Sequence, residues 1–146
     1  MIALLCLIVA IADGDTLTAR CGEPGAYQQV KVRLAEIDAP EKAQPFGNRS
    51  RQSLAQLCHQ QEATIRAEKR DRYGRSVARV ECQGKDASAH QVATGMAWAF
   101  TRYLTDLEIK RLEAAARAAG LGLWSEPGAV EPWEWRRLPA MPPASK

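Results

Sequence analysis

Aromatic residues and long apolar runs are both scarce in this chain. Phenylalanine, tryptophan and tyrosine make up 6% of the 146 residues, so we expect an aliphatic core. The longest apolar stretch, residues 1–12, is too short to cross a bilayer, which takes about 20 residues. It also lacks the basic n-region of a signal peptide, so we interpret it as a buried strand. The chain is therefore predicted to have no membrane span, and any export signal is expected to lie upstream of it.

A CxxC motif is also absent, and the wide cysteine spacings fit neither a zinc finger nor a redox motif. The four cysteines, Cys6, Cys21, Cys58 and Cys82, allow three full pairings. A hairpin turning at residues 13–14 would place Cys6 opposite or nearly opposite Cys21, near enough for a bridge if both side chains share a face. Cys58 and Cys82 would then remain as a second pair. Two disulfides would indicate a periplasmic or secreted protein; four buried thiols in a cytoplasmic protein are the alternative.

The length fits one domain, which we place at residues 1–125. Residues 126–146 are rich in proline and tryptophan and are expected to form a tail. Trp133 and Trp135 could dock on the domain, and about the last eight residues are expected to be disordered.

Hydrophobic patterns and turn residues predict mainly strands. Three strands are expected at residues 4–12, 15–21 and 28–37, and a hairpin at 62–69 and 74–82. One helix is expected from a cap near Asn48, a second from about Asp86 to Gly95, and a third from a capping box of Thr105 and Glu108 to Gly120. Five strands with a helix between the third and fourth predict an α+β, mainly β fold: the five-stranded OB-fold Greek-key barrel with three α-helices. A generic α+β sandwich is the alternative.

Acidic residues cluster in two predicted loops. Asp13 and Asp15 flank the glycine of the first turn, and Asp38 and Glu41 lie in the proline-containing loop after the third strand. Loops at strand ends are where ligands gather, and carboxylate oxygens are preferred ligands of calcium. The alternative for the Asp-Gly-Asp sequence alone is an ordinary hairpin turn.

Two arginines could bind a phosphodiester through their forked guanidinium groups. Arg33 lies on an apolar strand and needs an anionic partner, which a nearby carboxylate would also satisfy. Arg75 ends the sequence DRYGR, whose alternative is a tight turn with charges in water. The net charge is +3, and residues 66–79 carry six basic residues against two acidic ones. A polyphosphate backbone would suit this region, although a solvated edge hairpin is equally consistent with it.

Six motifs together resemble the thermonuclease, or staphylococcal-nuclease-like, family. They occur in the family's order over residues 7–125: VxIADGDT, VRLxxIDAPE, Phe46-Gly47, DRYGR, VATGMAW and AxxxGLGLWS. The resemblance implies an OB-fold barrel and a calcium-dependent nuclease. Such an enzyme hydrolyses DNA and RNA without sequence specificity, by in-line attack of water, and leaves 3′-phosphate products.

The resemblance also implies a role for each matching acidic position. Asp15, Asp38 and the backbone carbonyl of Ala39 would bind calcium, with Asp13 behind them. Glu41 would position or activate the attacking water.

Other matching positions would contact the substrate. The resemblance implies that Arg33 and Arg75 hold the scissile phosphate, and that the nucleotide is contacted or framed by Asp71, Arg72 and Tyr73.

The chain departs from the best-known members at the nucleotide pocket. Trp98 and Phe100 stand where those members have two tyrosines; the rings could stack on a base or simply close the barrel. The loop before the first helix is also shorter, which leaves the preference between DNA and RNA open. A noncatalytic single-stranded nucleic-acid-binding module of the same fold is the alternative function. We expect a monomer.

Overall fold

The strands alternate buried and exposed side chains, as strands with one face on a core do. In β2 (Thr16–Cys21), Leu17, Ala19 and Cys21 are buried, and in β6 (Ser76–Cys82) every second residue is buried. The inward side chains are mostly aliphatic, among them Ile8 and Val32, as the low aromatic content predicts. The buried side chains of neighbouring strands belong to one core cluster, so the strands share a single inward face.

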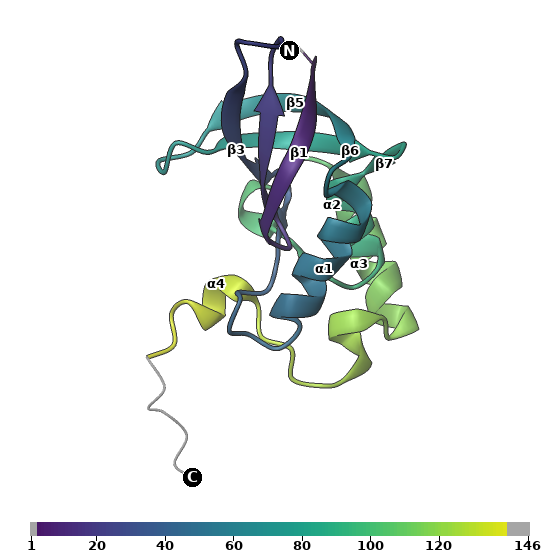
Figure 1. Ribbon diagram of the computed structural model, residues 1–146. Helices are drawn as coiled ribbons and strands as arrows, with labels where there is room; N and C mark the ends of the chain where they lie inside the picture. The colour runs from purple at the N-terminus through teal and green to yellow at the C-terminus, as the bar shows by residue number, and fades with distance from the viewer. Residues whose placement is uncertain (1–2, 140–146) are drawn as a thin grey trace.

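The computed structural model describes residues 3–139, and its strands form a closed barrel above a layer of helices (Figure 1). The strand order is β3-β2-β1-β5-β6, and parallel pairing of β3 with β6 closes the barrel. The remaining barrel strands are β1 (Ala3–Asp13), β3 (Gln28–Leu34) and β5 (Glu62–Arg70). The predicted five-stranded OB-fold barrel is confirmed.

The three predicted helices are present as α1 (Gly47–Cys58), α2 (Ala87–Ala93) and α3 (Leu107–Ala119). The structure adds several short elements: β4 (Ile37–Asp38), β7 (Lys85–Asp86), β8 (Trp98–Ala99), the 3-10 turns η1 (Thr101–Tyr103) and η2 (Gly122–Ser125), and α4 (Pro132–Trp135). No helix within residues 3–139 is long and apolar enough to span a bilayer.

Two predicted helix caps were wrong, although each helix starts within about one residue of the expected position. Helix α1 begins at Gly47 rather than after an Asn48 cap, and the Asn48 side chain accepts a hydrogen bond from Arg51 instead. Helix α3 is capped by Asp106, which accepts a hydrogen bond from the backbone N–H of Glu108. Thr105 does not form the expected capping box, because its N–H and hydroxyl both donate to Glu36.

The predicted third strand, 28–37, was also too long. It ends at Leu34, and Glu36 adopts a left-handed conformation with φ 75°. The carboxylate of Glu36 holds this bend by accepting bonds from Thr105 and from the backbone N–H of Asp106. The chain then re-enters an extended form as β4, which pairs with β8 and delivers Asp38.

The turn between β1 and β2 is locked to two helices. Gly14 is buried so tightly that a Cβ there would lie 1.8 Å from the Ser50 hydroxyl. Its carbonyl accepts a bond of 2.8 Å from the buried Gln91 side chain of α2, which also donates to the Ser50 carbonyl of α1. The Ser50 hydroxyl in turn donates to the carbonyl of Met96. Asp13 and Asp15 are therefore fixed in space by contacts far away in sequence.

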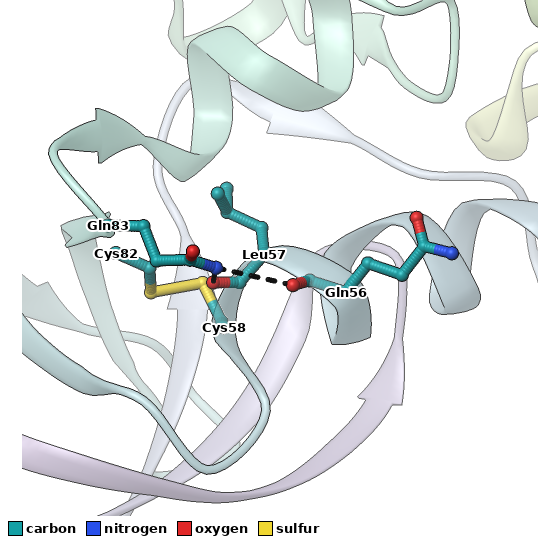
Figure 2. The surroundings of a disulfide bond; sticks show 5 residues. All are labelled: Gln56, Leu57, Cys58, Cys82 and Gln83. Atoms are coloured by element: carbon teal, nitrogen blue, oxygen red, sulfur yellow. Dashed lines mark hydrogen bonds between the residues drawn. A yellow bond between two sulfur atoms is a disulfide. The ribbon is translucent and has the colours of Figure 1, made fainter.

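Two disulfides join elements of the barrel. Cys6 lies opposite Cys21 in the β1–β2 register and is bonded to it. Cys58, at the end of α1, is bonded to Cys82 of β6. Figure 2 shows the second bond, beside which the Gln83 side chain donates to the carbonyls of Gln56 and Leu57. These two bonds satisfy carbonyls at the C-terminal end of α1 and help to hold that helix against the barrel.

Gly14→Ala should destabilise the protein by about 3 kcal/mol, because a methyl group would overlap the buried Ser50 and break its hydrogen bond. Urea unfolding measures the loss. Gly25→Ala is the control: a Cβ there meets open space at φ +86°, so only backbone strain of about 1 kcal/mol is expected. Equal losses in the two variants would contradict the packing described for Gly14.

The double variant Cys58→Ala/Cys82→Ala should lose about 3 kcal/mol of unfolding free energy, since the bond closes a loop with a sequence separation of 24. Urea unfolding of the variant and of the unreduced wild type measures the difference. The wild type in reducing agent should be less stable than the unreduced variant, because reduction also opens the Cys6–Cys21 bond. A variant as stable as the unreduced wild type would contradict the bond.

Candidate active site

Arg33 bridges two buried carboxylates at one end of the barrel. Its guanidinium lies 3.3 Å from Asp15 and 3.2 Å from Asp38, from one nitrogen to each. The same group donates to the carbonyls of Leu34 and Ile37 on either side of the bend. The structure therefore brings together three of the predicted site residues: Arg33 from β3, Asp15 from the turn before β2 and Asp38 from β4.

The position of Asp15 depends on its neighbours as well as on Arg33. One carboxylate oxygen accepts a bond of 2.7 Å from the backbone N–H of Ala39, and the other accepts from the Thr16 hydroxyl. Asp13 accepts from the backbone N–H of Asp15 and so lies behind it. The Ala39 backbone is thereby held beside the acidic cluster through its N–H; that its carbonyl is an ion ligand is what the family resemblance implies.

Burial governs the electrostatics of this cluster. Asp15 and Asp38 are only 5% and 1% exposed. Burial, with the nearby charge of Asp15, raises the pKa of Asp13 to about 7, and burial raises the pKa of Asp38 to about 6 against the opposing effect of Arg136 and Arg33. For Asp15, burial is outweighed by Arg33 and by its hydrogen bonds, which hold its pKa below the usual value. Burial thus favours the neutral form of Asp13 and Asp38, whereas Asp15 is held in its charged form by Arg33.

Glu41 joins the cluster through a residue that the sequence analysis did not assign. The Arg136 guanidinium donates to Asp38 with a bond of 2.7 Å and to Glu41 through its other terminal nitrogen. The Glu41 backbone N–H is held by the Gln44 side chain. Asp38 thus has Arg33 on one carboxylate oxygen and Arg136 on the other.

Arg75 lies at the edge of this site but is engaged locally. Its successor Ser76 pairs with Val32 in the parallel ladder, one residue before Arg33. Its guanidinium lies 2.7 Å from Asp71, and Asp71 also accepts from the backbone N–H groups of Tyr73 and Arg75. These bonds outweigh burial and lower the pKa of Asp71. The structure thus places the DRYGR turn next to β3, with Arg75 paired to Asp71.

The hairpin formed by β5 and β6 carries exposed basic side chains, as the charge pattern suggests. Arg72 lies over the ring of Tyr73, which is 69% exposed. Arg79 differs from the others, because it pairs with Asp86 and Asp106 and ties together the starts of α2 and α3. That arginine has a structural role.

Trp98, one of the two rings that could stack on a nucleotide, is not exposed in this structure. Trp98 is 1% exposed and packs edge-on against Trp124, with ring centroids 5.4 Å apart. Phe100 is also covered, because the ring of Trp133 stacks on it at 5.4 Å and 26°. The alternative reading, in which these rings close the fold, describes Trp98.

The predicted tail is partly docked. Its α4 lies close to the loop that follows β4 (Figure 1), and within that loop Gln44 donates to the carbonyl of Val130. Trp133 docks as expected, whereas the expected disorder falls mostly on residues 140–146, outside the described part of the chain. Sequence reasoning missed Arg136, Gln91 and Glu36, since each acts through a partner more than 30 residues away. In the sequence, the only indication of a role for the tail was the pair of arginines that follows PWEW.

The donor set at this site fits a hard cation. Residues 3–139 contain no ready group of three or more histidine, cysteine, aspartate or glutamate side chains that could hold a metal ion. The carboxylates of Asp15 and Asp38 are brought together on Arg33 instead, and the Ala39 backbone lies beside them through its N–H bond to Asp15. Calcium takes six to eight oxygens in flexible geometry, so water and substrate oxygens could complete such a set.

Comparisons with known proteins agree with this geometry. A family model described as staphylococcal nuclease homologue matches residues 31–126. An uncharacterized endonuclease of Haemophilus influenzae is 42% identical over 132 residues, which cover 90% of this chain and 72% of that protein. A micrococcal nuclease of Shigella flexneri is 43% identical over 141 residues, covering 89% and 79%. A staphylococcal-like nuclease of Arabidopsis thaliana is 30% identical over 127 residues, covering 87% of this chain and 39% of that protein. The chain therefore belongs to the staphylococcal nuclease family.

Proposed function

We propose that this protein is a calcium-dependent nuclease that hydrolyses DNA and RNA without sequence specificity and leaves 3′-phosphate ends. Its assignment as a nuclease is supported by the family match and by the names of its relatives. The observation that carries the finer proposal is the Arg33 guanidinium held between two buried carboxylates. A noncatalytic binding module would have no need for buried acids of this kind, which are costly to fold.

Asp15, Asp38 and the Ala39 carbonyl would hold the ion. When bound, calcium would supply a Lewis acid and a template for the phosphate. Arg33 already faces both carboxylates, so a phosphate oxygen beside the ion would also lie within reach of its fork. The carboxylates thus orient the arginine before substrate arrives.

Glu41 would orient the attacking water and accept its proton. Its side chain is 37% exposed, so water reaches it, and the Gln44 bond fixes its backbone. Arg75 would bind the phosphate from the neighbouring strand, with Asp71 holding its guanidinium ready. Because these contacts are made to phosphate and not to base edges, they carry no sequence information.

The two disulfides support export to the periplasm or to the medium, because such bonds persist in oxidising compartments.

The activity test uses DNA, single-stranded and double-stranded, and RNA, each with calcium or with chelator. We expect digestion only with calcium, and 3′-phosphate ends. Glu41→Gln and Arg75→Ala should each lower the rate by about 10²-fold or more, because each removes a contact to the reacting groups. Glu108→Gln and Arg111→Ala are matched controls, since this pair lies on the exposed face of α3 and should leave the rate unchanged. Digestion in chelator at the calcium rate, or full activity in both site variants, would overturn the proposal.

A thiol titration tests the compartment. Protein isolated from its native cells without reduction, and then unfolded, should show no free thiols. Four reactive thiols per chain would remove the support for export.

A further inference from the structure

The C-terminal strap, defined here as residues 130–136, contacts the acidic site at three separate points. The Val130 carbonyl accepts from Gln44, in the loop that carries Glu41. Trp133 stacks on Phe100, which follows β8. Arg136 donates to Asp38 and to Glu41. One short segment therefore spans the loop, the aromatic side chain and the carboxylates.

The contacts of Arg136 compete with those proposed for the ion. Asp38 is buried, and Arg136 takes the carboxylate oxygen that Arg33 leaves open. The guanidinium charge also lies beside the place where a divalent cation would be bound, and like charges repel strongly at such distances. Arg136 in this position thus serves as the counter-ion of Asp38 and Glu41.

The contact of Trp133 has a parallel consequence. Phe100 offers a flat ring near the site, and aromatic rings are where nucleobases stack in proteins that bind single strands. The ring of Trp133 occupies that face in a nearly parallel arrangement. A base could stack on this face of Phe100 only after Trp133 moves away.

We propose that the C-terminal strap is an intramolecular occupant of the active site, with Arg136 in the place of the divalent cation, and that ion binding and strap docking compete. This inference rests on the proposed calcium site. The strap is half-exposed at Arg136, whose side chain is 45% accessible, so its release requires no opening of the barrel core. In the resting protein, Arg136 neutralises the buried Asp38 and the partly exposed Glu41, which would otherwise repel each other.

Calcium titration calorimetry of the full chain, without nucleic acid, tests the competition. Arg136→Ala should bind calcium about tenfold more tightly than the wild type, because the ion no longer displaces a cation. Arg137→Ala is the matched control, because Arg137 pairs only with Glu134 among the described ion pairs and is 78% exposed. The calcium affinity of this variant should stay within twofold of the wild-type value. Unchanged or weaker binding by Arg136→Ala would overturn the proposal.

Trp133→Ala provides a second, independent variant. It removes the stacking contact while leaving every charge in place, and it should tighten calcium binding about threefold if the strap docks as a unit. Equal, measurable calcium affinities in the wild type, Arg136→Ala and Trp133→Ala would overturn the proposed competition with the strap. The proposed calcium site itself would stand. No calcium binding by any variant would overturn the proposed cofactor and the strap together.

Discussion

The structure depends most on the ion pairs that Arg33 makes with Asp15 and Asp38. Two carboxylates buried side by side repel each other, and each loses most of its contact with water. A planar guanidinium between them offsets both costs, and the carbonyls of Leu34 and Ile37 complete its hydrogen bonds. The bend at Glu36 turns the chain back after Arg33, so that Asp38 meets the same guanidinium.

The barrel and the helices supply the rigidity that this arrangement needs. The Gly14 turn cannot shift because Gln91 and Ser50 hold it from two helices, and Ala39 is fixed by its bond to Asp15. These contacts fix the backbone on both sides of the carboxylates. A site built in this way is organised before substrate arrives, which is the condition for electrostatic catalysis. Arg136, from the C-terminal end of the chain, adds a second guanidinium group to Asp38.

Local patterns in the sequence predicted what local physics controls. Alternating burial and turn residues located all five barrel strands to within about two residues at most ends, and the hairpin geometry placed Cys6 opposite Cys21. Predictions failed where a side chain interacts with a residue that is distant in the sequence. Thr105 is a good helix cap in isolation, but Glu36 binds its hydroxyl, and Trp98 is buried by Trp124. The motif residues Asp15, Asp38 and Arg33 could be named from their order along the chain, whereas Arg136 could not, since its acidic partners lie 95 and 98 residues away.

We propose that the buried carboxylates next to Arg33 form a divalent cation site. Calorimetry of calcium binding to the wild type and to Asp15→Asn is the decisive measurement. We expect one calcium site in the wild type and at least a hundredfold weaker binding in Asp15→Asn, which keeps the shape of the side chain but removes its charge. Equal calcium affinity in the two proteins would contradict it.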